Sequence, residues 1–266
     1  MSQGLLQGKH GVVLGVANDK SIAWGCAQAC AEHGAALTFN YLGESLEKRV
    51  RKLAETLPCE TALHPCDLTD DAQISEFFSA IEKAGRPIDF LIHSVAYAER
   101  DDLKNPFIET PRKNFSLALD ISAYSLVAAA RGAAPLMSDG GSIITMTYYG
   151  AEKIIPNYNV MGVAKAALEA SARYLAYDLG RRGIRVNCLS AGPLRTLSSS
   201  AIAGMRTMLN AAGAVTPMGR NITVEDVAGT AVYLLSDLAS GVTGEVIHVD
   251  NGYHAMGMFE EAPGTQ

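Results

Sequence analysis

Short apolar runs alternate along the chain with longer segments whose apolar residues recur at helical spacing. The short runs are typical of strands, which we expect at residues 11–15, 35–41, 61–65, 88–94, 142–147, 184–190 and 245–250. Helices are expected between them, at residues 21–33, 46–57, about 70–84, 111–137, 159–182 and 224–235. Ser21 suits the N-cap of the first helix, and Asp70 or Asp71 that of the third.

Strands that alternate with helices indicate βαβ units and a parallel sheet. The run Phe90-Leu91-Ile92 has no polar position, which suits a strand covered on both faces. We therefore expect an α/β fold: a single-domain, doubly wound Rossmann fold with a seven-stranded parallel sheet. No linker, repeat or charge block divides the chain, so the domain should span residues 1–258, followed by a loose tail at 259–266.

Composition narrows the class of protein. Of 266 residues, 48% are hydrophobic and 19% charged, which excludes a disordered chain. The net charge of −6 argues against nucleic acid or an anionic membrane as the main partner. The chain has neither a secretory signal nor an apolar stretch of about 18 residues that could span a membrane. Five cysteines without a C-x-x-C pair, and scattered histidines, predict free thiols, no metal site and a cytoplasmic location.

The end of the first expected strand is the first candidate for chemistry. Gly15 ends the strand, and Ser21-Ile22-Ala23 opens the following helix before Gly25. A glycine there lets the backbone approach a pyrophosphate, and the helix offers free N–H groups and its positive dipole end. The spacing is not G-x-G-x-x-G, so a plain turn is the alternative. Its position after the first strand favours a nucleotide.

The ends of the next strands favour NADH over NADPH. Glu44 would repel a 2′-phosphate after the second strand, while Lys48 and Arg49 come a turn later on a face that could be solvated. Asp67, after the third strand, could accept a hydrogen bond from an adenine amino group or could only cap a turn. Residues 94–96, after the fourth strand, are small enough for a cofactor to lie against them.

Tyr158 and Lys165 form the candidate proton-handling pair. Seven residues turn through about 700°, so the two project from one helix face roughly 10 Å apart along its axis. A tyrosine with a pKa of about 10 is a poor acid or base at neutral pH, and a nearby ammonium is expected to lower that pKa. The alternative is a packed tyrosine beside a lysine that reaches solvent.

Two other tyrosines lie nearby in the sequence. Tyr149 and Lys153 have the Y-x-x-x-K spacing of ordinary short-chain dehydrogenases, but Gly150 and Pro156 predict a loop there, so we interpret the match as accidental. Tyr148 follows the fifth strand at the edge where ligands bind. It could hydrogen-bond a substrate carbonyl or could be an aromatic residue on the rim.

These motifs resemble those of the bacterial NADH-dependent enoyl-acyl carrier protein reductases, which are divergent short-chain dehydrogenases. The resemblance rests on the segment from Gly15 to Ala23 and on Tyr148-x9-Tyr158-x6-Lys165. It continues nearly end to end, through residues 187–196 to 244–250. The Tyr-x6-Lys spacing is specific, because ketoreductases of this fold use Tyr-x3-Lys.

The resemblance implies that NADH reduces the β-carbon of a trans-2-enoyl thioester in fatty acid synthesis. It implies catalytic roles for Tyr148, Tyr158 and Lys165, with Tyr158 donating to the enolate oxygen and Lys165 holding the nicotinamide ribose and influencing Tyr158. The resemblance also implies that Ala98 contacts the substrate. The cofactor contacts that it implies are Gly15, Ser21, Ile22, Leu42, Asp67, Leu68, Ser94, Val95, Lys165, Leu194, Thr196 and Ser198.

The family also implies a homotetramer, an acyl carrier protein or coenzyme A thioester as substrate, and a substrate lid at about residues 194–216. Leu42 replaces a polar residue common at the adenine edge. The basic rim expected for an acidic carrier protein is thin here, around Arg195, Arg206 and Arg220. Two alternatives remain open: a 3-oxoacyl thioester ketoreductase of the same fold, and a nucleotide-binding regulator without turnover.

Overall fold

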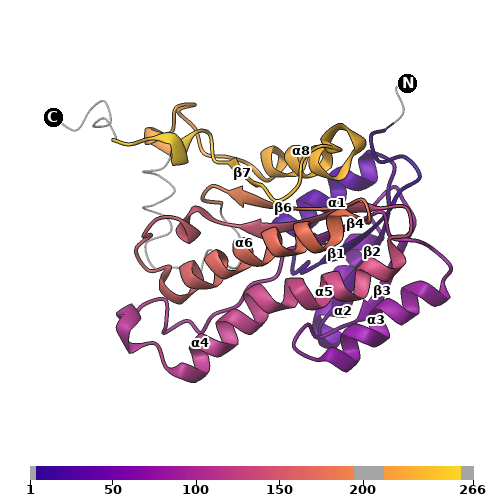
Figure 1. Cartoon of the computed structure of the whole chain (residues 1–266), viewed down its shortest axis with the longest axis horizontal. Helices are drawn as coiled ribbons and strands as arrows, with labels where there is room; N and C mark the ends of the chain where they lie inside the picture. Colours follow the sequence, from indigo (N-terminus) through magenta and orange to yellow (C-terminus); the bar gives the residue numbers. More distant parts are fainter. Residues whose placement is uncertain (1–3, 195–212, 259–266) are drawn as a thin grey trace.

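The chain forms one seven-stranded sheet. The computed structural model describes residues 4–194 and 213–258. Within them all strand pairs are parallel, in the order β3-β2-β1-β4-β5-β6-β7 (Figure 1). The strands are β1 His10–Leu14, β2 Ala36–Tyr41, β3 Thr61–Pro65, β4 Phe90–His93, β5 Gly141–Thr147, β6 Ile184–Ala191 and β7 Val246–Val249. The predicted doubly wound, seven-stranded parallel sheet is therefore confirmed.

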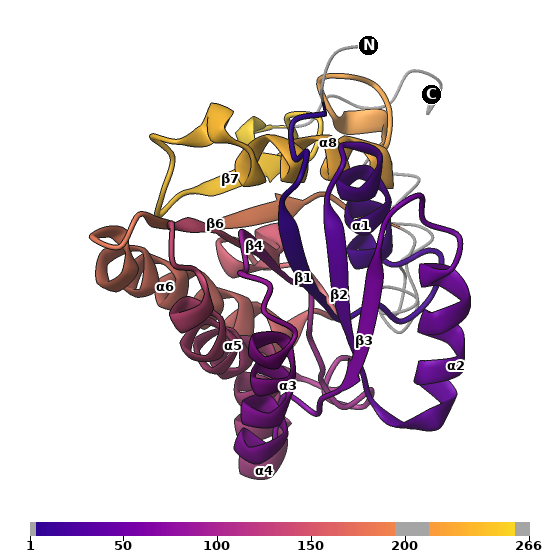
Figure 2. The same ribbon diagram turned by 90° about the vertical axis from the view of Figure 1, so that its right-hand side faces the viewer.

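Helices cover both faces of this sheet (Figure 2). They are α1 Ile22–Glu32, α2 Gly43–Ala54, α3 Asp71–Lys83, α4 Arg112–Leu119, α5 Ser125–Ala133, α6 Asn159–Gly180 and α8 Val224–Leu235. Residues of α1, α2 and α8 pack with Val13 in one core cluster, while residues of α3, α5 and α6 pack with Val12 and Leu14 in another. Successive side chains of a strand point to opposite faces, so β1 supplies both cores.

Two predicted N-caps are confirmed and fix where their helices begin. The Ser21 hydroxyl accepts from the N–H of Trp24 at the start of α1. The Asp70 carboxylate accepts from the N–H groups of Ala72 and Gln73 at the start of α3. Such caps satisfy N–H groups that have no partner inside the helix.

The expected helix at 111–137 is wrong in one respect, because a π-helical turn at Asp120–Tyr124 separates α4 from α5. The Ser125 hydroxyl, at the start of α5, donates to the carbonyl of Ile121 in this turn at 2.6 Å. A 3-10 turn at Ala134–Leu136 then ends the segment. The regular apolar spacing of the sequence carries no sign of the extra residue that a π turn inserts.

Several sequence-based expectations fall beyond the described residues. Thr196, Ser198, most of the expected lid and the tail at 259–266 lie outside them.

All five cysteines are free thiols, as predicted. Among the described residues, no helix is long and apolar enough to cross a membrane.

Candidate active site

The crossovers change direction between β1 and β4, the position at which doubly wound sheets bind ligands. Leu14 at the end of β1 is in register with His93 at the end of β4, so Gly15 and Ser94 lie side by side. Gly15 has a φ of 95°, and a Cβ there would lie 2.2 Å from the Ser94 carbonyl oxygen. Only glycine fits this turn, which carries the chain from β1 over the sheet edge toward α1.

Asn40 braces the same edge. Its side-chain oxygen accepts from the N–H of Gly15 at 3.0 Å, and its side-chain nitrogen donates to the carbonyl of Cys66 at 3.1 Å. One buried amide thus joins the ends of β1, β2 and β3. We did not single out this residue from the sequence, although a polar residue in an otherwise apolar strand was a usable signal.

The N-terminus of α1 opens at this edge. The Ser21 hydroxyl donates to the carbonyl of Asn18 at 2.7 Å and accepts from Trp24. This cap takes one of the first N–H groups of the helix, and the N–H of Ile22 belongs to the same first turn. With the positive end of the helix dipole, such a terminus attracts a phosphate.

The predicted adenine side lies at the ends of β2 and β3. Leu42 is 55% exposed there and offers an apolar surface. One Asp67 carboxylate oxygen accepts from both the N–H and the hydroxyl of Thr69, so Asp67 does stabilise a turn. Lys48 lies 3.9 Å from Glu44, while Arg49 donates to the carbonyl of Ala17 at 3.2 Å in the loop that precedes α1.

Tyr148 and Tyr158 meet on the other side of this edge. Their ring centroids are 4.9 Å apart at 78°, an edge-to-face arrangement. Ala98 packs in the same small apolar cluster with Leu103 and Met161. The structure thus brings together both predicted tyrosines and the predicted substrate contact.

Lys165 lies two turns along α6 from Tyr158 and is only 6% exposed. Its ammonium donates to the carbonyl of Met146 at 2.6 Å, on the strand that leads into Tyr148. Burial lowers the pKa of Lys165 to about 8. Lys165 is therefore held against β5 with a proton that it can lose close to neutral pH.

The expected downward shift of the tyrosine pKa is wrong. Burial raises the pKa of Tyr158, and the neighbouring Tyr148 and Glu169 raise it further. Burial likewise raises the pKa of Tyr148 to about 12. Both phenols are therefore neutral hydrogen-bond donors at neutral pH, because burial disfavours the charged phenolate.

Two buried polar residues at this edge were missed by the sequence interpretation. Glu169, one turn beyond Lys165, accepts from the Thr147 hydroxyl at 2.7 Å, and burial raises its pKa. His93 ends β4 with its ring nitrogens 2.8 Å from the hydroxyls of Thr145 and Ser125, and burial lowers its pKa to about 3. Both were visible in the sequence as polar residues at positions that face a core.

The remaining predicted contacts divide between the described and undescribed parts of the chain. Leu194 and Ile22 both pack against the core cluster that contains residues of α1 and α8. Thr196 and Ser198 lie outside the described residues.

The Tyr149–Ala151 segment forms a 3-10 turn and not an α-helix, in agreement with the expected loop. The Tyr149 hydroxyl donates to the carbonyl of His254 at 3.3 Å, in contact with the chain after β7.

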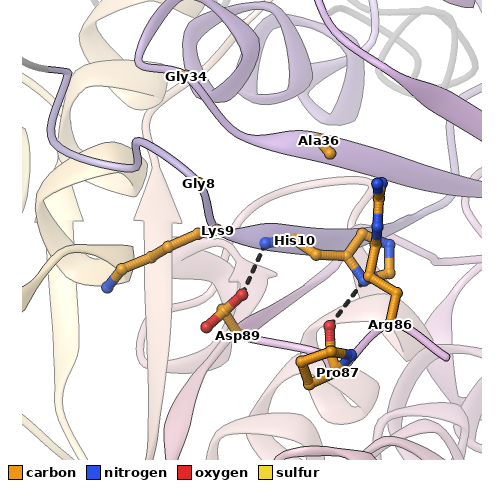
Figure 3. A pocket seen from close by; sticks show the side chains of 8 residues that line it. All are labelled: Gly8, Lys9, His10, Gly34, Ala36, Arg86, Pro87 and Asp89. Carbon is orange, nitrogen blue, oxygen red and sulfur yellow. Dashed lines mark hydrogen bonds between the residues drawn. The ribbon is translucent and has the colours of Figure 1, made fainter.

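A separate cavity of about 230 Å³ lies where β1 and β2 begin, at the opposite edge of the sheet (Figure 3). His10 donates its N–H to the Asp89 carboxylate at 2.7 Å, and its ring contacts the Pro87 carbonyl and the Thr38 hydroxyl. The lining cations Lys9 and Arg86 are paired with Asp237 and Glu60. These groups already satisfy one another, so this cavity lacks the available chemistry of the carboxyl edge.

The fold and the buried Tyr158 and Lys165 define a Rossmann-type oxidoreductase of the short-chain dehydrogenase class. A family model described as enoyl-(acyl carrier protein) reductase matches residues 15–254. The chain belongs to this family, as the sequence resemblance implied.

Individual relatives agree along nearly the whole chain. Enoyl-[acyl-carrier-protein] reductase [NADH] 1 of Rhizobium meliloti is 54% identical over 97% of this chain and 94% of its own length. The FabI enoyl-[acyl-carrier-protein] reductase [NADH] of Rickettsia prowazekii is 53% identical, over 97% and 98%. The Bacillus cereus enoyl-acyl carrier protein reductase, crystallised with NADP+ and indole naphthyridinone, superimposes with a TM-score of 0.94 at 52% identity, over 96% and 100%.

Proposed function

We propose that this protein reduces the trans-2 double bond of enoyl thioesters with NADH, and that acyl carrier protein presents the acyl chain. The observation that carries the proposal is the buried Tyr158 phenol, packed against Tyr148 at the edge where α1 begins. The names of the relatives, which are NADH-dependent enoyl reductases, support the same reaction. An oxidoreductase function follows from the family.

The residues at the carboxyl edge suit a dinucleotide. The Gly15 turn and the N-terminus of α1 would hold the pyrophosphate, with contributions from Ser21 and Ile22. The adenosine would be contacted by Leu42, Asp67 and Leu68. The rest of the dinucleotide would be contacted by Ser94, Val95, Lys165, Leu194, Thr196 and Ser198. The carboxylate of Glu44, two residues after Leu42, would repel a 2′-phosphate. The chemistry that NADH supplies there is hydride donation to the β-carbon of the substrate.

Tyr158 stabilises the charge that develops on the thioester oxygen. Because its pKa is raised, the hydroxyl keeps its proton and donates a hydrogen bond to that oxygen as an enolate forms. The edge-to-face contact with Tyr148 restricts the orientation of the Tyr158 ring. Lys165, held by the Met146 carbonyl, supplies positive charge on the same helix face. Ala98 lines the acyl side of the site.

We further propose a cytoplasmic homotetramer with a substrate lid at residues 194–216 within a domain at 1–258. The free thiols suit a reducing compartment. The exposed side chains of Tyr124, just before α5, and of Tyr174 and Tyr177 on α6 support burial of these segments by other subunits. Arg220 is bound to Asp226 at 2.7 and 3.0 Å, so attraction of an acidic carrier protein would fall mainly to Arg195 and Arg206.

The test is the oxidation of NADH, followed by absorbance, with crotonyl and acetoacetyl thioesters side by side. We expect turnover with the crotonyl thioester, little with acetoacetyl, and a lower rate when NADPH replaces NADH. Turnover with acetoacetyl alone would instead identify a ketoreductase. Cofactor binding without turnover of either thioester would identify a regulator.

A further inference from the structure

The backbone on both sides of Tyr158 has an uncommon conformation. Asn157 and Asn159 have φ values of 64° and 40°, in the left-handed region that residues other than glycine seldom adopt. Asparagine tolerates this region better than most residues. Left-handed residues at a reaction site are retained only where their surroundings hold them, and the contacts of Asn159 show what holds it.

The Asn159 side chain reaches a turn that lies more than 50 residues away in sequence. Its amide nitrogen donates to the carbonyl of Asp102 at 3.0 Å and to the carbonyl of Asn105 at 2.9 Å. Both hydrogens of the amide are thereby used on backbone acceptors of one segment, residues 101–105. We call this segment the 101–105 turn.

The 101–105 turn places an apolar side chain on Tyr158. Leu103 lies between the two acceptor residues, is buried, and packs in the cluster that holds Tyr158 and Met161. Tyr148 and Ala98 contact the same cluster. Through Leu103, the 101–105 turn therefore covers part of the Tyr158 ring and shields it from solvent.

The turn does not keep this position by its own contacts alone. It has local backbone bonds, from the N–H groups of Lys104 and Asn105 to the carbonyl of Asp101. One carboxylate oxygen of Asp102, however, is buried without a hydrogen-bond partner among the described residues. Burying such an atom disfavours this arrangement, and the two bonds from Asn159 oppose that cost.

We propose that Asn159 is a positioning residue: by holding the 101–105 turn and Leu103 against Tyr158, it fixes the phenol for donation to the thioester oxygen. The proposal rests on the function proposed for Tyr158. Asn159 itself acts through the turn. Release of the turn would admit water to the phenol and widen the range of its ring positions, and misplacement by about 1 Å can lower a rate by about 100-fold.

The experiment compares Asn159→Asp and Asn159→Gly with the wild-type enzyme. Asp keeps the size and the tolerance of left-handed φ but lacks the two donated hydrogens. Gly removes the backbone strain together with the side chain, and so serves if the Asp variant fails to fold. Lys104→Ala is the matched control, because this exposed side chain lies in the same turn.

We expect both Asn159 variants to lose about 10- to 100-fold in kcat with crotonyl thioester and NADH, while NADH affinity measured by fluorescence changes less than about twofold. Lys104→Ala should match the wild type. Leu103→Ala should reduce kcat similarly, and its combination with Asn159→Gly should cost little more than the larger single change, because both act through the turn. A folded Asn159→Gly enzyme with wild-type kcat, or effects that multiply in the double variant, would overturn the proposal.

A second readout separates this proposal from the assignment of the reaction. With 13C-labelled tyrosine, and the Tyr158 signal assigned from Tyr158→Phe, the pKa of Tyr158 can be followed by NMR. Both Asn159 variants should lower it toward the ordinary value of about 10, because water reaches the ring. An unchanged titration would overturn the positioning role. If the wild-type enzyme does not reduce enoyl thioesters, the proposed function fails, and this titration alone decides the role of Asn159.

Discussion

The two edges of the sheet hold polar groups in contrasting states. At the edge where β1 and β2 begin, His10 donates to the Asp89 carboxylate and its ring contacts the Pro87 carbonyl (Figure 3). The ring also contacts the Thr38 hydroxyl, and Lys9 forms an ion pair with Asp237. At the carboxyl edge, Lys165 is buried on the Met146 carbonyl, and the Tyr158 phenol is packed among apolar side chains. Each edge therefore has a lysine with a short hydrogen bond, but in different surroundings.

The contrast distinguishes groups that stabilise the fold from groups that remain available for chemistry. A carboxylate at 2.6 Å satisfies the charge of Lys9, whereas burial without such a partner lowers the pKa of Lys165 to about 8. Perturbed pKa values of this kind concentrate at reaction sites. A cavity alone is thus a poor guide, because the cavity of about 230 Å³ belongs to the edge whose groups are satisfied.

The largest difference between the edges should appear when the lysine at each edge is replaced by alanine. Lys165→Ala should lower turnover by about 10²- to 10⁴-fold and weaken NADH binding, because it removes the buried positive charge on the helix that carries the proton donor. Lys9→Ala, at the other edge, should retain nearly full activity per folded molecule. Steady-state kinetics with crotonyl thioester would measure both, and normal turnover by Lys165→Ala would contradict the assignment of the helix pair.

The next largest effect separates two tyrosines only nine residues apart. Tyr158→Phe removes the donor to the developing charge and should cost about 10²- to 10³-fold in kcat, the range for one such donor. Tyr149→Phe loses only the long contact with the His254 carbonyl and should stay close to wild type. Equal losses would restore Tyr149 and Lys153 as the catalytic pair.

Stability should depend on pH through Lys165. Its pKa is about 8 in the fold against 10.5 ordinarily, so between these values the unfolded chain binds the proton more tightly. Folding stability due to Lys165 therefore rises with pH across that window, by up to about 3 kcal/mol. Denaturant unfolding of the wild type and Lys165→Met at pH 8 and pH 10 would measure it. Because buried thiols and phenols titrate in the same range, the difference between the two proteins is the relevant quantity, and a constant difference would refute the prediction.

The smallest effect should appear at the satisfied edge. His10→Ala leaves Thr38 without its ring partner and should cost about 1–3 kcal/mol of stability, with activity per folded molecule unchanged. Burial lowers the pKa of His10 below 6.5, so its contribution is present above that pH and is lost as the pH falls below it. The stability difference between wild type and variant should accordingly shrink in acid. A loss of turnover in folded His10→Ala would contradict the division between the two edges.

The strands and most helices could be predicted because each repeats a simple hydrophobic period. The expected and observed bounds coincide for β3 and for α8. Features that depend on local backbone geometry, with no repeating pattern in the sequence, were harder to predict. Helix α2 begins at Gly43, three residues earlier than expected, because a φ of 73° there lets the chain turn directly out of β2. The π turn at Asp120–Tyr124 gave no pattern at all.

At the site, spacing along one helix predicted that Tyr158 and Lys165 share a face, since that relation is local. Asn40, His93 and Glu169 act through partners distant in sequence, so spacing could not identify them. The sign of the Tyr158 pKa shift also depends on how deeply the ring is buried, which is a property of the assembled core.

The destination of the hydride tests the central claim most directly. Crotonyl thioester and NADH carrying deuterium at the reactive carbon of its nicotinamide would be incubated with the enzyme, and the product examined by NMR. The proposed reaction predicts a saturated butyryl thioester with one deuterium on the β-carbon, formed about 10²- to 10³-fold more slowly by Tyr158→Phe at the same enzyme concentration. Unlabelled crotonyl thioester recovered intact, while acetoacetyl thioester yields a deuterated 3-hydroxyacyl product, would contradict it.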